Sequence, residues 1–421
     1  MEAGWGGAAG TSKPVLGFDP DIFPRVLKEL KSHLADQEGF DLNSLYFLLY
    51  AFAENKDPGL AEFLEQKFSA FSDSIEGKDN LFQAAETARL FWDAFSVLRT
   101  EQFLESGQKL VEFLSGFYDD KLGALVDPKR GAAFASQNAA AVRSFLAAYP
   151  YLQNQKLKDK VKNALEFIQG KLYDPLLGLI RRFPSVSKDL EYGYLDDCAA
   201  SILAFTDAYL QSGNKSYRDF ADVLAKSMLQ ELWDREKGGF LSHVKADSSS
   251  RSSIILGRDN AVPKNYEETA SQEKISQEAL FHNARAFEAL WRLGYIKGQN
   301  AYFKWIDLGL HRFLDEKILG AEAAFASILD MRLQGRIELE IVGRVEEESS
   351  RKMLETLASF YAPRKIISFI NPDDQDYILA HGLEAESYPR LFGCVDLKRR
   401  ADTPNSDRES VSRVLNAAWR C

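Results

Sequence analysis

An aromatic residue followed by aspartate, and then by a short apolar run containing glycine, occurs three times in this chain of 421 residues. The copies begin at Tyr118-Asp119, Tyr173-Asp174 and Trp233-Asp234, and each closes an amphipathic stretch. The third copy is the fullest and runs from Trp233 to His243. Recurrence at intervals of 55 and 60 residues indicates one supersecondary unit used repeatedly. Such units must stack or close into a ring to bury their apolar faces.

Segments with helical periodicity are of two kinds. Residues 154–172 and 214–233 each carry one apolar stripe, which is typical of a helix with one face in solvent. Residues 195–210 are apolar on most sides, as expected of a helix between an outer layer and a lumen. Inner helices are predicted near 43–53, 81–98, 136–149, 195–212, 273–293 and 321–333. Outer partners are predicted near 59–75, 100–118, 154–173, 214–233, 298–314 and 346–360. The predicted fold is mainly α, an (α/α)6 toroid over residues 20–335.

The last unit contains strand-like segments. Arg336–Val342 and Lys365–Ile370 alternate or run apolar on either side of the helix near 346–360. This order predicts a βαβ segment, residues 336–395, that closes the barrel and supplies the twelfth helix of the ring. Residues 1–19 and 396–421 are predicted to be tails. The non-helical insert 245–270 has a length typical of a lid or of disorder.

The charge balance disfavours a nucleic-acid partner, because 62 acidic against 52 basic side chains give a net charge of −10 and phosphate backbones need a basic surface. The longest apolar run, Leu45–Ala53, is far shorter than the roughly 20 residues of a membrane-spanning helix, so no membrane partner is expected. Cys198, Cys394 and Cys421 are widely spaced, which fits a reducing compartment and a cytoplasmic location.

The sequence contains no glycine-rich phosphate loop and no pair of metal ligands at helical spacing. Neither a cofactor nor a metal is therefore expected. The sequence leaves the identity of a protein partner open.

Four residues near the N-terminal ends of predicted inner helices are candidates for catalysis. In such a toroid these ends share one rim with the turns that leave the outer helices. Asp197 lies in the first turn of an inner helix, where unpaired amides and the helix dipole favour a carboxylate. Glu278 and His282 lie on the fifth inner helix, and His243 ends the fullest turn. Histidine suits proton transfer near neutral pH. The alternatives are a core position for His282 and a solvated loop position for His243.

Further rim residues are candidates for substrate binding. Tyr194, Trp233 and Phe240 are aromatic and suit stacking against sugar rings. Asn283 and Arg285 follow His282 on the fifth inner helix and are predicted to add polar contacts. Trp233 closes a one-sided stripe and therefore also suits a place in the core. Tyr194, outside the helix proper, is the stronger candidate for a ligand contact.

The run Gly193-Tyr194-Leu195-Asp196-Asp197, followed by Trp233-Asp234 and Gly238-Gly239-Phe240, resembles the barrel portion of the spermatogenesis-associated protein 20 family. Ala289–Leu293 and Ala321–Gly343 extend the resemblance over most of residues 80–370. It implies an (α/α)6 barrel of the six-hairpin glycosidase type, similar to those of N-acylglucosamine 2-epimerases.

This chain departs from the family at two points. The thioredoxin-like domain that members typically carry has no counterpart in these 421 residues, so the resemblance does not carry redox activity over to this chain. Where the family tends to show Ser-Gly-Asn-Ser, this chain has Phe281-His282-Asn283-Ala284.

Two functions are open on the sequence. The first is a carbohydrate-active protein with a sugar ligand, either a hydrolase using Asp197 with Glu278 or an epimerase using His243 with His282. The second is a non-catalytic barrel that binds a sugar, a peptide or a protein. An open polar lumen with perturbed carboxylates favours the first function, and a lumen filled with aromatic and aliphatic side chains favours the second.

Overall fold

A computed structural model describes residues 18–19, 21–35, 41–73, 80–184, 193–244, 276–314, 319–395 and 398–419. It confirms the mainly α fold and the (α/α)6 toroid. The inner ring is formed by α2 (Leu42–Asn55), α4 (Leu81–Leu98), α6 (Ala135–Leu152), α8 (Leu195–Ser212), α10 (Gln277–Lys297) and α12 (Leu319–Gln334). Each inner helix contacts the next, and α12 contacts α2, so the ring is closed around a lumen.

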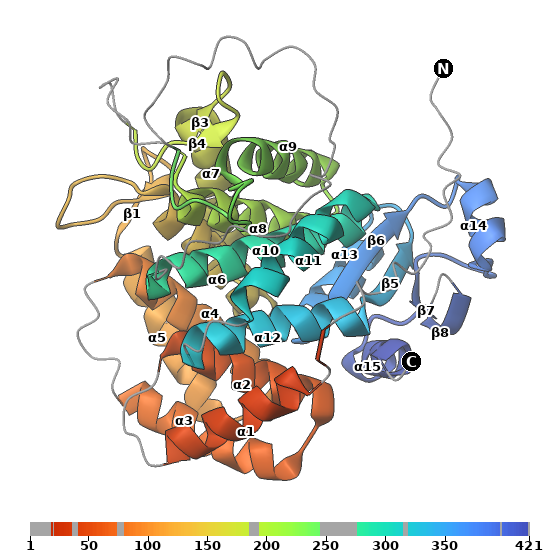
Figure 1. Ribbon diagram of the computed structural model, residues 1–421. Coiled ribbons are helices and arrows are strands. Elements are labelled where there is room, and N and C mark those ends of the chain that lie inside the picture. Colours follow the sequence, from red (N-terminus) through yellow and green to blue (C-terminus); the bar gives the residue numbers. More distant parts are fainter. Residues whose placement is uncertain are drawn as a thin grey trace.

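An outer layer of helices covers this ring (Figure 1). It consists of α3 (Pro58–Asp73), α5 (Glu101–Ser115), α7 (Gln155–Phe167), α9 (Lys215–Leu232), α11 (Asn300–Phe313) and α1 (Ile22–Ala35). One π-helical turn, η1 (Ile168–Leu172), continues α7. None of the helices in the described ranges combines the length and apolarity needed to cross a membrane.

The twelfth helix of the ring is α1, not the helix that the sequence analysis assigned to this place. α1 packs on α12 and buries Val26, Leu30 and Leu34 there. The predicted twelfth helix, α13 (Glu348–Ala358), instead contacts the inner helices α6 and α8 and the C-terminal helix. Its side chains share an apolar cluster with the sheet, and its connection to two strands of that sheet holds it there.

The C-terminal region is a four-stranded sheet with helices, larger than the predicted βαβ segment. Parallel strands β5 (Ile337–Val342) and β6 (Lys365–Ile370) flank α13 in the chain, as expected. Antiparallel strands β7 (Arg390–Val395) and β8 (Lys398–Thr403) extend the sheet in the order β6-β5-β7-β8. A short helix, α14 (Gln375–His381), lies between β6 and β7 in the chain. Figure 1 shows this unit, in blue, at one side of the ring.

The structure corrects the prediction that residues 396–421 form a tail, because most of this segment is regular secondary structure. Residues 398–403 form β8, and α15 (Arg408–Trp419) packs on β5, β7 and β8. Val411, Val414 and Leu415 on α15 are buried, so the charged composition of this region belongs to the solvent face of an amphipathic helix. The predicted lid 245–270 and residues 1–17 of the predicted N-terminal tail lie outside the described residues.

The repeated aromatic-Asp motif forms the same tight turn three times. Two copies are hairpins, β1 (Tyr118–Asp119) with β2 (Ala124–Leu125) and β3 (Tyr173–Asp174) with β4 (Leu179–Ile180); the third pairs Trp233 with Phe240. In each copy the aspartate side chain accepts a backbone hydrogen bond from the residue two positions later. A glycine four positions after the aspartate then adopts φ near +70°: Gly123 (73°), Gly178 (68°) and Gly238 (71°). A residue with a β-carbon is strained in that region, which explains the glycines.

Side-chain amides of the inner helices hold two of these turns in place. Asn138 on α6 accepts from the Leu125 amide at 2.7 Å and donates to the Leu125 carbonyl at 3.0 Å. Asn283 on α10 accepts from the Phe240 amide at 2.6 Å and donates to the Phe240 carbonyl at 3.1 Å. The motif is therefore the joint at which an outer helix turns back toward the next inner helix.

Candidate functional site

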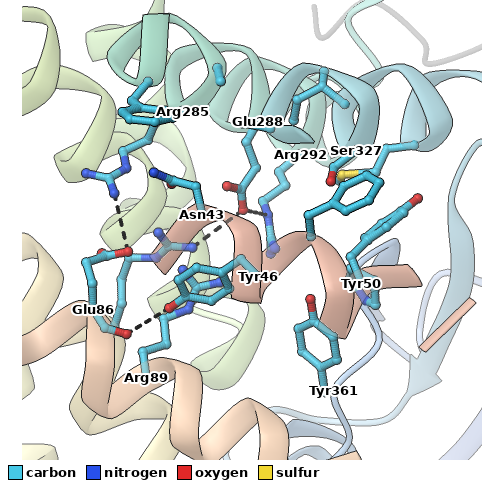
Figure 2. Close-up of a pocket in the computed structure, with 18 residues that line it drawn as sticks. Asn43, Tyr46, Tyr50, Glu86, Arg89, Arg285, Glu288, Arg292, Ser327 and Tyr361 are labelled. Carbon is cyan, nitrogen blue, oxygen red and sulfur yellow. Dashed lines mark hydrogen bonds and ion pairs between the residues drawn. The ribbon is translucent and has the colours of Figure 1, made fainter. Parts of the chain in front are cut away.

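The lumen of the ring contains a cavity of about 120 Å³ whose lining mixes charged, aromatic and aliphatic side chains. We name it the upper cavity. Its lining comes from five inner helices, of which α6 contributes Arg143, and from the connector between α13 and β6. The polar and aromatic lining residues are Asn43, Tyr46, Phe47, Tyr50, Glu86, Arg89, Arg143, Phe281, Arg285, Glu288, Arg292, Ser327 and Tyr361. Figure 2 shows the labelled side chains of α4 and α10 pointing toward one another across this cavity.

Two inner helices that are otherwise mostly apolar each carry three charged residues at helical spacing. α4 carries Glu86, Arg89 and Asp93, and α10 carries Arg285, Glu288 and Arg292. Both sets are spaced i, i+3, i+7, which places each set on one face of its helix. The second set reverses the charges of the first, so the two faces are complementary. The Arg285 Nη2 to Glu86 Oε2 distance of 3.3 Å joins them.

Four side chains from three inner helices form a closed ring of ion pairs. Arg143 Nε lies 2.8 Å from Asp207 Oδ2, and Arg292 Nε lies 3.0 Å from Glu288 Oε1. Each arginine also approaches the other's carboxylate, Arg292 to Asp207 at 3.3 Å and Arg143 to Glu288 at 3.5 Å. Burial alone would raise the pKa of both carboxyls. The arginines outweigh burial and hold the pKa of Asp207 and of Glu288 below the usual values.

A second cavity of about 100 Å³, the lower cavity, lies beyond the arginines. Arg89, Arg143, Arg292, Tyr361 and Pro363 line both cavities, so the two are compartments of one lumen. The lower cavity is also lined by Trp92, Asp93, Ser96, Tyr151, Asp207, Gln211, Phe360 and Lys365. Residues 358–367, from the end of α13 into β6, therefore line it from the side of the C-terminal sheet.

Burial shifts the pKa of two titratable groups that line the lower cavity. Desolvation raises the pKa of Asp93 to about 6, although Arg89 lies 3.6 Å from its carboxylate and acts in the opposite direction. Desolvation lowers the pKa of Lys365 to about 8. The Lys365 ammonium donates to the carbonyls of Leu357 and Phe360, both at 2.7 Å. The lower cavity thus combines a proton-binding carboxyl with a buried ammonium group.

The rim of the barrel holds a separate cluster around Asp196 and Asp197, in the first turn of α8. Asp197 is fully buried and accepts from Arg182 Nε at 3.0 Å and from the Ser136 amide at 3.0 Å. Arg182 also donates to Asp196 at 2.9 Å. Burial and the neighbouring Asp196 raise the pKa of Asp197 to about 7. Asp197 therefore ties the starts of α6 and α8 together.

The other predicted catalytic residues surround this cluster without lining either cavity. The exposed His243 ring lies 5.6 Å from the Tyr194 ring and is tilted by 34° relative to it, and Arg182 covers the Tyr194 ring at 3.6 Å. His282 is half-buried, and burial lowers the pKa of its imidazole while nearby Asp196 acts to raise it. Glu278 is exposed. The proposed pair of Asp197 with Glu278 thus joins a fully buried carboxyl to one in solvent.

Three of the predicted substrate-binding residues are part of the protein interior. Trp233 is 6% exposed and packs edge-on against Phe240 and Trp305. Phe240 is also buried. The side-chain amide of Asn283 is hydrogen-bonded to the backbone of Phe240 in the turn described above. Tyr194 lies under Arg182. Of the nine predicted site residues, Arg285 lines the upper cavity, and the other eight line neither the upper cavity nor the second cavity described above.

The sequence analysis missed the other charged residues of the lumen, although a signal for them exists. Glu86, Arg89, Asp93, Glu288 and Arg292 interrupt helices that are otherwise apolar on most sides. Charged residues repeated at i, i+3 and i+7 on a helix predicted to face a lumen indicate groups that meet inside it.

Searches of protein-family models and of curated proteins find no match to this chain. Solved structures do match. A protein from Listeria innocua has 11% identity and a TM-score of 0.56, covering 75% of this chain and 98% of its own. An α-1,6-mannanase of glycoside hydrolase family 76 from a Salegentibacter species has 12% identity and a TM-score of 0.56, with coverage of 75% and 99%.

A family 105 glycoside hydrolase from C. acetobutylicum has 11% identity and a TM-score of 0.52, covering 70% of this chain and 82% of its own. The chain has the six-hairpin glycosidase-like barrel fold. At these identities the likeness concerns the fold alone.

Proposed function

We propose that this chain is a carbohydrate-binding (α/α)6 barrel that holds a saccharide in the upper cavity. The observation that carries the proposal is the lining of that cavity, in which guanidinium and carboxylate groups alternate with Tyr46, Tyr50 and Tyr361. Sugars need donors and acceptors for their hydroxyls and aromatic faces for their apolar C–H surfaces. Carboxylates held ionised by arginine are strong acceptors for hydroxyl groups.

The solved neighbours support a sugar as the ligand class. An inactive variant of the Salegentibacter mannanase was solved with α-1,6-mannotriose, and another with α-1,6-mannotetrose. The barrel of this chain is similar to that barrel, and charged side chains line the two cavities in its lumen. A polar lumen with perturbed carboxylates favours a carbohydrate-active protein over a barrel filled with apolar side chains.

A thermal-shift screen against mono- and disaccharides and α-1,6-mannotriose tests the proposal, because a ligand of the native state raises the melting temperature. We expect Arg285→Met to abolish the shift, since it removes the guanidinium that faces Glu86 in the cavity. The matched control is Arg218→Met on α9, which removes a guanidinium paired with the exposed Asp219 outside the lumen. A panel that leaves the wild-type melting temperature unchanged would overturn the proposal.

A second candidate is acid–base catalysis on a sugar at the rim, with Asp197 and His282 as proton-transfer groups and Glu278 and His243 beside them. Asp196 and Asp197 are consecutive, and the pKa of Asp197 is raised to about 7. The inactive mannanase variants replace two consecutive aspartates, which favours this candidate by analogy. If the wild type hydrolyses α-1,6-mannotriose and Asp197→Asn and His282→Ala do not, the rim is catalytic. A wild type without turnover rejects this candidate.

We also propose, from the sequence motifs, a relationship to the spermatogenesis-associated protein 20 family and a cytoplasmic location. The β5-α13-β6 segment that follows the barrel supports the relationship, since the resembling run 321–343 enters it. Homologues that place a thioredoxin-like domain before an equivalent barrel would strengthen this relationship, and alignments that match only the general fold would weaken it. Fractionation of cells that express the tagged chain tests the location.

A further inference from the structure

We propose that the lower cavity binds the anionic group, a carboxylate or a phosphate, of a charged saccharide whose sugar ring lies in the upper cavity. This inference rests on the proposed function and names the class of sugar. It depends on three features of the lower cavity: its polar atoms that lack hydrogen-bond partners among the described residues, its charge balance and its continuity with the upper cavity.

The first feature is a set of buried polar atoms without hydrogen-bond partners. In the part of the chain that the structure describes, no hydrogen-bond partner is present for Trp92 Nε1, Arg143 Nη2 or Asp93 Oδ2, and all three residues line the lower cavity. Asp93 Oδ2 has an ion-pair contact with Arg89 Nε, at 3.6 Å. Arg143 is only 2% exposed, and its Nη2 approaches Glu288 at 3.5 Å, too far for a normal hydrogen bond. A buried polar atom without a partner is costly, so such atoms gathered at one cavity indicate a ligand that satisfies them.

The kinds of these atoms define the ligand. Trp92 Nε1 and Arg143 Nη2 are donors and need acceptor oxygens. Asp93 Oδ2 accepts from a hydroxyl group, and with a pKa of about 6 the carboxyl also takes up a proton in mildly acidic solution. An anionic group next to a sugar hydroxyl supplies both kinds of partner. The charge-assisted bonds from arginine to a carboxylate or phosphate are the strong ones in this set.

The second feature is an excess of positive charge in a chain whose net charge is −10. Arg89, Arg143, Arg292 and Lys365 line the lower cavity, against the two carboxyls of Asp93 and Asp207. Glu288 faces Arg143 and Arg292 as well, which leaves four cations against three carboxyls. Within the described residues, the hydrogen-bond acceptors of the Lys365 ammonium are two backbone carbonyls, and the carboxylates of Asp93 and Asp207 act on its charge without bonding to it.

The third feature is the shared wall of the two cavities. Arg89 contacts both compartments, and its guanidinium lies over the Tyr46 ring at 5.4 Å, at the upper side, and 3.6 Å from Asp93. A sugar ring beside Tyr46 therefore has its substituents near the arginines and, beyond them, near Lys365. A neutral sugar leaves the lower cavity without a counter-charge.

Binding measurements on the full chain test this inference with four probes: glucose, glucuronate, glucose 6-phosphate and inorganic phosphate. We expect glucuronate or glucose 6-phosphate to bind at least about tenfold more tightly than glucose, because a charge-assisted hydrogen bond contributes more than a neutral one. Inorganic phosphate is expected to bind more weakly than glucose 6-phosphate, since it makes no contact in the upper cavity.

Two substitutions move the preference in opposite directions. Lys365→Met removes the uncompensated cation and is expected to lower the ratio of anionic to neutral affinity to near one. Asp93→Asn removes a negative charge and is expected to raise that ratio, so it keeps the test informative if Lys365→Met fails to fold. Lys158→Met is the matched control, because Lys158 pairs with Glu355 on the protein surface.

The outcomes separate this inference from the proposed function. Equal binding of glucose and the anionic sugars overturns the inference and leaves the sugar-binding proposal intact. Phosphate that binds as tightly as glucose 6-phosphate also overturns it, since the sugar then contributes nothing. If no probe and no sugar of the wider panel binds, the proposed function itself fails.

Discussion

Charged residues in the lumen set the chemistry of this barrel at the scale of single residues. Buried ion pairs are weak contributors to stability, because desolvation offsets most of their attraction. The ring of Arg143, Asp207, Arg292 and Glu288 therefore has no strong stabilising role, and apolar residues of similar volume would pack as well. Its position between the two cavities agrees with the proposed recognition of a ligand.

Asp93 makes the stability of the protein depend on pH. The native state keeps a proton on this carboxyl up to about pH 6, whereas the unfolded chain loses it near pH 4. Between these values the native state binds more protons, so the free energy of unfolding falls as pH rises, by about 3 kcal/mol in all. The Asp93→Asn variant has no titrating carboxyl at this position, so its free energy of unfolding does not undergo this fall. We expect its stability relative to wild type to increase from about pH 4 to about pH 7 in urea titrations.

The control for Asp93 is Asp219→Asn on α9. Although burial acts to raise it, the pKa of Asp219 is lowered by Lys297 and Arg218. The native state then binds fewer protons than the unfolded chain, so this variant is expected to lose stability relative to wild type as pH rises. A relative stability of Asp93→Asn that does not change with pH would contradict the assignment.

Asn283 is predicted to be a stability residue. Asn283→Ala removes three hydrogen bonds, to both backbone groups of Phe240 and to the Ala279 carbonyl, and leaves buried backbone groups unpaired. We expect a loss of about 2–4 kcal/mol in the free energy of unfolding. Asn416→Ala, at an exposed position of α15, is expected to change it by less than about 0.5 kcal/mol. Equal losses of unfolding free energy in the two variants would show that the turn does not depend on the hydrogen bonds of Asn283.

At the scale of elements, the sequence pattern predicts helix bounds well where a helix packs by one apolar stripe or is buried on all sides. The predicted inner helices 81–98 and 195–212 coincide with α4 and α8, and the predicted outer helix 214–233 corresponds to α9. Periodicity works there because burial on one side or on all sides leaves different patterns. It cannot show which helix pairs with which, and so α13 was placed in the ring instead of α1.

Close packing between α10 and α11 depends on Gly309. A β-carbon at this position would lie 1.9 Å from Cζ of Phe287 and would therefore clash with the aromatic ring of this fully buried side chain. Gly309→Ala is therefore expected to destabilise by about 1–3 kcal/mol through overpacking, although alanine favours helices by about 1 kcal/mol over glycine. Gly170→Ala, with no neighbour within 4 Å, is expected to be neutral or stabilising. Thermal unfolding of both variants checks the contrast.

At the scale of the whole molecule, the ring is completed by the helix nearest the N-terminus. α1 packs on α12, so the first helix covers the last inner helix and brings distant parts of the chain together. Leu30→Ala is expected to lower the free energy of unfolding by about 2–5 kcal/mol, as for a core residue. Lys28→Ala on the exposed face of α1 is expected to have little effect. A Leu30→Ala variant as stable as wild type would mean that α1 is dispensable.

The amino-acid sequence by itself determined the architecture of the barrel. The aromatic-Asp-glycine turn depends on local backbone rules, and the two kinds of helix depend on local periodicity, so both are readable from short segments. Arg285 is the part of the candidate site that was predicted, because the sequence analysis placed it on an inner helix as a polar residue for substrate binding, and it lines the upper cavity.

Only the tertiary structure decided which groups meet inside the ring. Arg143 on α6 and Asp207 on α8 are 64 residues apart, yet their side chains bond at 2.8 Å. Such a pairing depends on how neighbouring helices are rotated about their axes, and packing of the whole ring sets that rotation. For the same reason, sequence spacing placed Asp197 at the rim but did not reveal that Arg182 and the Ser136 amide already occupy its carboxylate.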